Sequence, residues 1–314
     1  MHFIITVDTE ADDQWRENRG ITCRNIEYLP RFQELCERYG FIPTYFTTYE
    51  IAADPDAVKT LKPWQDNGRA EIGAHLHPWT TPPLASEKKS EHCFPSELAD
   101  EVLKNKLINL TEIIEKNFGR RPTSYRAGRW GFDGRQAGLL SELGYLADSS
   151  ITPKINWSKE SGRSERVGGP DFRLAPLGPH RLASGLLEVP MTILFTGLIK
   201  KEKSAWSKKF LALPGGWPKK IINRLFFRQK WLRIFANSTL RDWEQIYRSA
   251  ILNGLPALVF MIHSSELMPG GSPYARDEKA VEHVYGQLEQ IFGLYKKYGL
   301  KGSGLSDFAR NYKN

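Results

Sequence analysis

Apolar strand-like runs alternate with amphipathic helix-like segments along most of this chain, and that order restricts the fold more than any other feature. Residues typical of strands fill 3–10, 42–48, 70–76, 123–126, 145–148, 187–190 and 255–262. Helical periodicity covers 26–39, 53–67, 96–118, 135–143 and 277–298, with a strand, loop and helix expected between 302 and 311. Strands separated by helices pair in parallel, with the helices outside. We therefore predict an α/β fold in which the region from about 150 to 241 forms elaborated loops.

Polar side chains with catalytic potential stand where the predicted strands end. They are Asp8, Glu10, His75, His77, Arg126, Asp148 and His263. In parallel α/β proteins the chemistry lies at the carboxyl ends of the strands, so these residues are expected to meet. A single histidine at a strand end is more often a hydrogen-bonded structural residue. So many positions at successive strand ends are difficult to explain by packing alone.

His75 and His77 are the most specific signal within this set. Residues at i and i+2 of a strand point to the same face, so both imidazoles can reach one ion. Neutral imidazole is a common ligand for zinc and similar ions. Asp8 and Glu10 share a face in the same way. The sequence therefore predicts a divalent metal site, with zinc as the expected ion, beside a pair of carboxylates.

Composition sets the class of protein. With 314 residues, 40% of them hydrophobic, the chain can bury a sizeable core. Its three cysteines form neither an even disulfide framework nor a Cys-x-x-Cys zinc motif. Seven residues before Asp8 leave no room for a secretory leader, and no apolar run approaches the ~20 residues of a spanning helix. We expect a soluble, cytoplasmic protein.

The net charge of +8 is concentrated in one segment. Between Lys200 and Phe235 there are eleven Lys or Arg and one acid, Glu202, whereas the rest of the chain has 33 basic and 35 acidic residues. Tryptophans and phenylalanines are interleaved with these charges, so we expect a basic, aromatic-rich insertion at about 199–240. It is either a solvated insertion or a surface for an anionic membrane or a phosphate-bearing substrate. Nucleic acid is not expected, because no recognition motif accompanies the charge.

Five motifs, taken in order, resemble the NodB-homology polysaccharide deacetylases, carbohydrate esterase family four. They are Val7-Asp8-Thr9-Glu10, Ile72-Gly73-Ala74-His75-Leu76-His77, Tyr125-Arg126-Ala127-Gly128-Arg129-Trp130-Gly131, Leu146-Ala147-Asp148-Ser149 and Met261-Ile262-His263-Ser264. Within that family, His-Leu-His-Pro-Trp and His-Ser-Ser-Glu-Leu resemble the WalW-type proteins of lipopolysaccharide or surface-glycan biosynthesis. The resemblance covers most of the chain. It implies a single catalytic domain over 1–314 with a distorted (β/α) barrel of about seven parallel strands.

The resemblance also implies roles for individual residues. Asp8 would be the catalytic base, paired with Arg126, and His263 the general acid, with its ring oriented by Asp148. Glu10, His75 and His77 would hold the metal ion. From the residues themselves, we also expect Trp79, Arg129, Trp130 and Glu266 to contact the substrate, because tryptophan stacks on sugar faces and Glu266 begins a long loop beside His263. The implied reaction removes an N-acyl group, typically acetyl, from an amino sugar that is nucleotide-linked or lipid-linked, and the basic segment would bring the protein to the inner membrane face.

Two departures from the family pattern affect the metal site. The usual Asp-Asp is here Asp8-x-Glu10, so Glu10 would take the metal role. The usual His-x-x-x-His is here His75-x-His77, and Trp79 stands where the second ligand is expected. Either His77 supplies the second imidazole by a different backbone path, or the site has lost a ligand.

Two other functions remain open at this stage. The loss of a ligand would leave a catalytically inactive glycan-binding or scaffold protein. Alternatively, Asp8 and Glu10 could be the carboxylate pair of a glycosidase, because acids at i and i+2 can approach the ~5 Å separation of a retaining enzyme. That chemistry would leave His75, His77 and His263 without a role.

Overall fold

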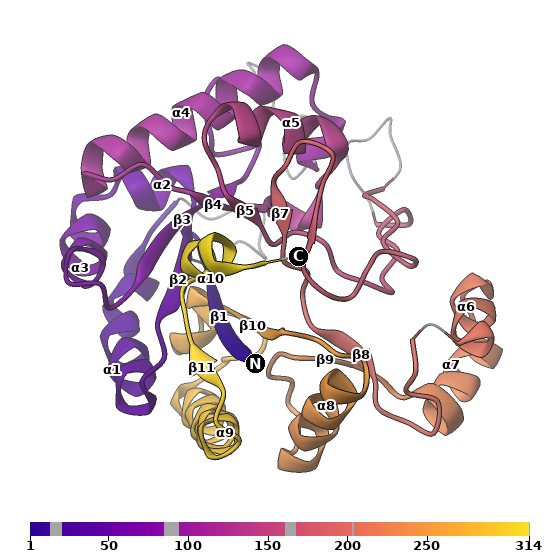
Figure 1. Cartoon of the computed structure of the whole chain (residues 1–314). Helices are drawn as coiled ribbons and strands as arrows, with labels where there is room; N and C mark the ends of the chain where they lie inside the picture. The colour runs from indigo at the N-terminus through magenta and orange to yellow at the C-terminus, as the bar shows by residue number, and fades with distance from the viewer. Residues whose placement is uncertain (13–20, 85–93, 161–167, 203, 314) are drawn as a thin grey trace.

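The computed structural model describes residues 1–12, 21–84, 94–160, 168–202 and 204–313 (Figure 1). Within these residues, one sheet contains nine strands. They are β1 (His2–Thr9), β2 (Pro43–Thr47), β3 (Glu71–Leu76), β4 (Ser124–Ala127), β5 (Ala147–Asp148), β6 (His180–Arg181), β7 (Leu187–Glu188), β10 (Ala257–His263) and β11 (Lys301–Gly302). Two more strands, β8 (Ile193–Phe195) and β9 (Gln229–Trp231), pair with each other in antiparallel fashion.

The large sheet runs in the order β10-β1-β2-β3-β4-β5-β7-β6, with β11 beside β1. Its strand pairs are parallel except for β6 with β7. The predicted α/β fold with a mostly parallel sheet is therefore confirmed. The predicted number of about seven strands is not, because the sheet has nine. β6 is two residues long and leaves no periodic signal in the sequence, whereas β11 lies at the strand expected near residue 302.

Helices surround the curled sheet (Figure 1). The described helices are α1 (Leu29–Tyr39), α2 (Tyr49–Ala53), α3 (Pro55–Asp66), α4 (Asp100–Phe118), α5 (Gly134–Glu142), α6 (Ala205–Ala212), α7 (Trp217–Ile222), α8 (Leu240–Leu252), α9 (Glu278–Lys297) and α10 (Leu305–Asn311), of which α6 and α7 stand apart from the sheet. Local signals set several of their ends. The Asp54 carboxylate accepts the N–H groups of Asp56 and Ala57 at the start of α3. Gly40 adopts a left-handed φ of 72° and ends α1.

Alternation along the strands produces two apolar layers. In β1, Phe3, Ile5 and Val7 belong to the large core between the sheet and the outer helices. Ile4 belongs to a second core inside the curl, together with Met261 of β10. Successive side chains of a strand point to opposite faces. The inner positions at the carboxyl ends of these strands are therefore left for polar residues.

The sheet curls into a half-barrel whose open edge is bridged by residues 189–192. The N–H of Val189 donates to the carbonyl of Asp148 at 2.8 Å, which extends the β7 side. The hydroxyl of Thr192 accepts the N–H of Val259 in β10 at 2.8 Å. Ser306, in α10, donates its hydroxyl to Glu71 at the start of β3, at 2.6 Å. α10 thus lies at the amino ends of the strands, and their carboxyl ends are left for the candidate site.

The region predicted as loops, 150–241, contains β6 to β9, α6, α7 and the start of α8. Among the described residues, the helices fall short of the length and apolar character needed to cross a membrane.

Candidate metal centre

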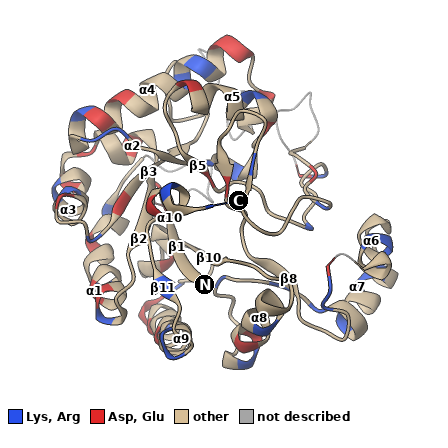
Figure 2. Cartoon of the chain, viewed as in Figure 1, with Lys and Arg blue, Asp and Glu red and all other residues tan. Residues whose placement is uncertain are grey.

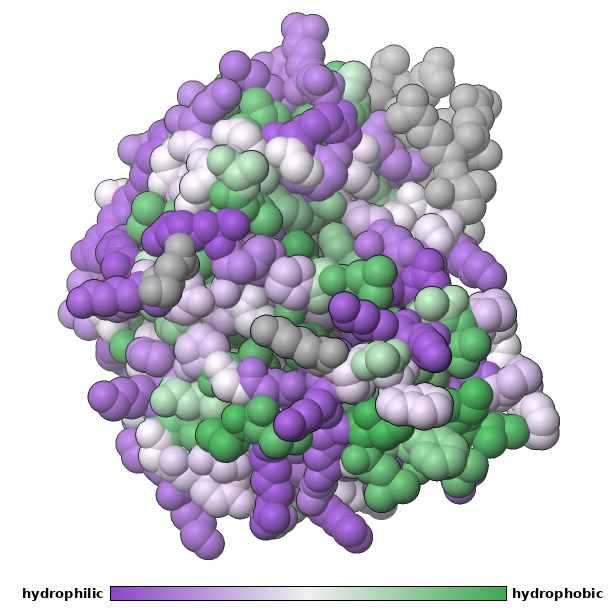
Figure 3. Space-filling view, turned by 45° about the vertical axis from the view of Figure 1, so that its right-hand side comes forward, coloured by the Kyte–Doolittle hydropathy of each residue, from purple (hydrophilic) through white to green (hydrophobic). Residues whose placement is uncertain are grey.

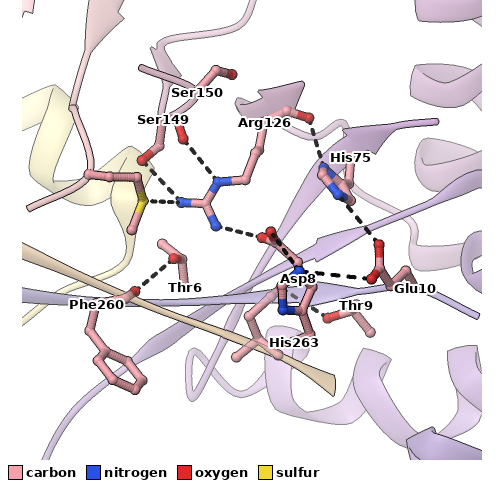
Figure 4. A network of polar contacts seen from close by, with 12 residues as sticks. Thr6, Asp8, Thr9, Glu10, His75, Arg126, Ser149, Ser150, Phe260 and His263 are labelled. Carbon is pink, nitrogen blue, oxygen red and sulfur yellow. Dashed lines mark hydrogen bonds and ion pairs between the residues drawn. The ribbon is translucent and has the colours of Figure 1, made fainter. Parts of the chain in front are cut away.

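The carboxyl ends of β1, β3, β4 and β10 bring together most of the predicted reactive residues, and Figure 4 shows Asp8, Glu10, His75, Arg126 and His263. In β3, Ala74 and Leu76 pack outward into the large core, so His75 lies on the inner side. In β1, Val7 packs outward, and Asp8 takes the inner side. Asp8 is also directly opposite His263 in the register of β1 and β10. The strand period therefore places these side chains as the sequence pattern predicts.

Glu10, His75 and His77 form a compact group of possible metal ligands, and all three are buried. One ligand atom from each lies within 4.8 Å of the others. The Nε2 atom of His77 is 3.1 Å from Oε2 of Glu10 and 3.1 Å from Nε2 of His75. The Nε2 atom of His75 is 3.8 Å from the same carboxylate oxygen. The His75-x-His77 spacing left two alternatives: His77 supplies the second imidazole, or the site has lost a ligand. The geometry agrees with the first, because His77 reaches the group.

The donor chemistry of this group fits a divalent cation. Nδ1 of His75 lies 3.0 Å from the carbonyl oxygen of Arg126, and because a carbonyl only accepts, this nitrogen carries the proton. A neutral ring then presents its Nε2 lone pair to the group, which is the arrangement of a metal-binding histidine with an oriented ring. Burial lowers the pKa of His75 to about 4, which keeps the ring neutral at pH 7. Two imidazoles and one carboxylate are a common protein ligand set for catalytic zinc.

Asp8 and Arg126 form a buried ion pair beside this group. Oδ1 of Asp8 is 2.5 Å from a terminal nitrogen of Arg126, whose side chain is fully buried. The guanidinium also donates to the carbonyl and hydroxyl oxygens of Ser149. Burial alone would raise the pKa of Asp8, but the charges of Arg126 and His263 and the hydrogen bond from Arg126 lower it to about 2. Asp8 is therefore ionised at neutral pH.

His263 faces both carboxylates from β10. Its Nε2 atom is 3.9 Å from Oδ2 of Asp8 and 3.9 Å from Oε1 of Glu10. Its Nδ1 atom donates to Oε1 of Glu266 at 2.7 Å. Arg233 donates to that same oxygen at 2.7 Å. Burial opposes a charged ring, yet the hydrogen bond to Glu266 and the nearby carboxylates raise the pKa of His263.

Asp148 is placed differently from the prediction that it orients His263. Its carboxylate accepts the hydroxyl of Ser150 at 2.6 Å and shares a hydrogen bond with Glu188. The residue that orients the ring of His263 is Glu266, in the short helical turn after β10. The prediction misplaces this contact because Glu266 follows His263 by three residues in a tight turn, which a strand-end pattern does not reveal.

The four residues predicted to contact the substrate have different surroundings in the structure. Trp79 stacks on the ring of His77, with ring centroids 4.3 Å apart. Arg129 and Trp130 follow β4 with positive φ values of 52° and 62°, a conformation that is uncommon outside glycine. Glu266 is 1% exposed and accepts hydrogen bonds from His263 and Arg233, and its contact with substrate stays a prediction.

Two residues of this region were missed by the sequence patterns. Glu188 lies in a predicted strand, but nothing in the sequence shows that it pairs with Asp148. Arg233 is hidden within the basic segment, where its charge resembles ten others. Its contact with Glu266 spans 33 residues and depends on the tertiary fold.

A comparison with protein-family models gives no match, and neither does a comparison with curated protein sequences. Solved structures do match. A candidate polysaccharide deacetylase from Mycobacterium smegmatis has a TM-score of 0.53 at 16% identity, over 98% of this chain and 89% of its own. Another, from Pseudomonas aeruginosa PAO1, has a TM-score of 0.54 at 15% identity, over the same shares of the two chains. The chain shares their fold.

The same fold occurs with a different chemistry. A GH57 branching enzyme from Thermococcus kodakaraensis has a TM-score of 0.56 at 13% identity, over all of this chain and 71% of its own. Identities this low carry no information about the reaction. The residues of the site must therefore separate deacetylase from glycosidase chemistry.

Proposed function

We propose that this protein is a metal-dependent hydrolase that removes an N-acyl group, typically acetyl, from an amino sugar. The observation that carries the proposal is the buried group of Glu10, His75 and His77 beside the ion pair of Asp8 and Arg126. A glycosidase would use two carboxylates and needs no histidine pair. Amide hydrolysis at a metal site uses all of these groups.

Glu10, His75 and His77 would hold the divalent ion, with zinc as the expected metal. When bound, such an ion polarises an acyl carbonyl and lowers the pKa of a water molecule toward ~7. Burial raises the pKa of Glu10, and a cation would favour its charged form.

Asp8 is the proposed general base. Arg126 engages its Oδ1 atom, which leaves Oδ2 to accept the proton of the attacking water. The low pKa of Asp8 keeps this carboxylate in the accepting form at neutral pH. Because Arg126 is itself fixed by Ser149, the base is held in one orientation.

His263 is the proposed general acid. Its Nε2 atom faces the site, and Glu266 holds Nδ1 on the opposite side of the ring. The raised pKa favours a protonated ring, which can donate to the departing amine nitrogen as the C–N bond breaks. Water thus supplies the hydroxyl of the released acid, and the sugar retains a free amine.

The expected substrate is an amino sugar or glycan of surface-polysaccharide or lipopolysaccharide assembly, carried on a nucleotide or lipid. Support for this finer assignment comes from the resemblance of the motifs around His75 and His263 to the WalW-type group. In this proposal, the enzyme acts in the cytoplasm on activated sugars.

The test is release of acetate and free amine from a panel of N-acetylated amino sugars that includes free, nucleotide-linked and oligomeric forms. The zinc-loaded protein should release both products, and Asp8→Asn and His263→Gln should lower kcat by about 10²–10⁴-fold. Formation of new reducing ends without acetate would instead show glycosidase chemistry.

No acetate from any member of the panel would contradict the proposal. If the same sugars then bind without turnover, the inactive glycan-binding protein becomes the better account. Binding is measured by saturation-transfer NMR on the same samples.

A further inference from the structure

Helices α6 and α7 project from the side of the half-barrel (Figure 1). This part of the chain has a small apolar core of its own. This core consists of Phe195, Phe210, Leu211 and Phe227. The rings of Phe210 and Phe227 stack with centroids 4.1 Å apart. Since Phe195 belongs to β8, the core fixes α6 to the body of the protein, and Ile222 at the end of α7 packs against the same core.

The segment that contains α6 and α7 exposes several large apolar side chains. Trp206 and Trp217 are 69% and 75% exposed. Leu213, Leu225 and Phe226 are exposed on the same segment. Figure 3 shows hydrophobic side chains gathered with hydrophilic ones on the side of the molecule where α6 and α7 lie in Figure 1. Apolar patches of this kind on a protein surface mark contact with a partner or a membrane.

The charge of the same surface is positive. Lys208, Lys209, Lys220 and Arg224 are exposed, and α6 and α7 contain no acidic residue (Figure 2). The single acid between residues 200 and 235 is Glu202, whose carboxylate is buried and lies 3.2 Å from the amine of Lys154.

One further acid, Asp171, lies close enough to the segment that its charge acts on the pKa of Lys219. The Asp171 carboxylate already forms an ion pair with Arg173 at 2.6 Å. These two acids therefore do not neutralise the exposed lysines around the two tryptophans.

We propose that the surface formed by Trp206, Leu213, Trp217, Leu225 and Phe226 with the lysines around them docks on an anionic lipid bilayer. Tryptophan is favoured at the boundary between lipid and water, and lysines beside it are attracted to acidic headgroups. The helices lie on the bilayer and do not cross it, because α6 and α7 have eight and six residues.

The charge argues against other occupants. A second copy of the chain at this face would bring two positive surfaces together. Nucleic acid would pair with the lysines but would leave the exposed leucines and Phe226 in water.

The test is co-sedimentation with vesicles of phosphatidylcholine, with or without about 30 mol% phosphatidylglycerol. The wild-type protein should bind the anionic vesicles, and salt should weaken binding. One variant combines Trp206→Ser with Trp217→Ser, and another combines Lys208→Glu, Lys209→Glu and Lys220→Glu. Each should lower the partition coefficient by at least about tenfold.

The matched controls are Lys59→Glu with Lys104→Glu and Lys297→Glu, and Val102→Ser, which change exposed residues outside α6 and α7. They should bind as the wild type does. All variants alter exposed side chains, and circular dichroism confirms that they fold.

Absence of binding to anionic vesicles at low salt would overturn the proposal, and so would equal binding by the wild type and both variants. Two further results would also overturn it. One is dimerisation that the tryptophan substitutions abolish, and the other is competition by DNA for the same face. His75→Ala should bind vesicles normally, so failure of the membrane proposal is distinguishable from failure of the hydrolase proposal.

Discussion

Arg233 links the basic segment to the candidate metal centre. It donates to the carboxylate of Glu266, which in turn accepts the Nδ1 proton of His263. Each of the three side chains has at most 11% exposure, so water competes weakly for these hydrogen bonds. The proposed general acid is therefore oriented by Glu266 and, through Glu266, by Arg233.

Removal of Arg233 should lower turnover without removing the metal. We expect Arg233→Ala and Glu266→Gln to reduce kcat by about 10–100-fold with little change in KM, because the ring of His263 loses its fixed orientation. Arg233→Lys should recover part of kcat. Activity assays are run beside metal analysis of each variant, and an unchanged kcat in Glu266→Gln would contradict this positioning role.

Asp148 and Glu188 form a buried carboxyl pair next to the site. Burial raises the pKa of both groups, and the charge of Asp148 adds to the effect on Glu188. The folded protein therefore retains a proton that the unfolded chain releases above about pH 4.5. The stability from this pair is complete below that pH and is lost as the pH rises through the folded-state pKa.

Glu188→Gln should become more stable than the wild type as the pH rises. The amide keeps a donor for Asp148 at all pH values, and its oxygen can still accept the N–H of Ile151. We expect the difference in unfolding free energy to grow by about 1–3 kcal/mol between pH 5 and pH 8, measured by urea denaturation.

Glu188→Ala is the control, since it removes both interactions. It should lose about 2–4 kcal/mol across the same range. A pH-independent difference between Glu188→Gln and the wild type would show that the pair holds no shared proton.

At the level of strands and helices, the sequence predicts the regular part of the chain well. β1, β3 and β10 are recognisable because their apolar residues face a helix layer on one side and a core or polar site on the other. The same period predicts that Asp8, His75 and His263 point inward. β8, β9, α6 and α7 are not predicted, because their packing depends on contacts such as Phe195 with Phe227 rather than on a local pattern.

The position of His77 depends on a close approach between β3 and the turn after β4. A Cβ atom at Gly128 would lie 2.6 Å from Cδ2 of His77 and would also meet the carbonyl of Leu76. Such distances are far below van der Waals contact. The absence of a side chain at Gly128 therefore allows the His75-x-His77 spacing to bring both rings to the metal site.

Gly128→Ala should push His77 out of place and weaken zinc binding by about 10–100-fold, as measured by competition with a fluorescent chelator. Gly138→Ala in α5 is the matched control, because nothing lies within 4 Å of the added methyl group. Its affinity for zinc should equal that of the wild type. Equal affinities for all three proteins would contradict this role of Gly128.

At the scale of the whole molecule, the fold alone does not select the reaction. Candidate polysaccharide deacetylases and a GH57 branching enzyme have similar TM-scores to this chain. The parallel sheet and its site at the strand ends could be predicted from sequence, since both follow from alternation. The partners of His263 could not, because Glu266 and Arg233 reach it through a tight turn and a contact across 33 residues.

The most direct test of the account is the metal content of the purified protein after incubation with zinc, measured by elemental mass spectrometry beside His75→Ala and His77→Ala. We predict about one ion per wild-type chain and loss of that ion in both variants, since each histidine supplies one of three protein ligands. A folded wild-type protein that remains metal-free after incubation with zinc, cobalt and nickel would contradict the account.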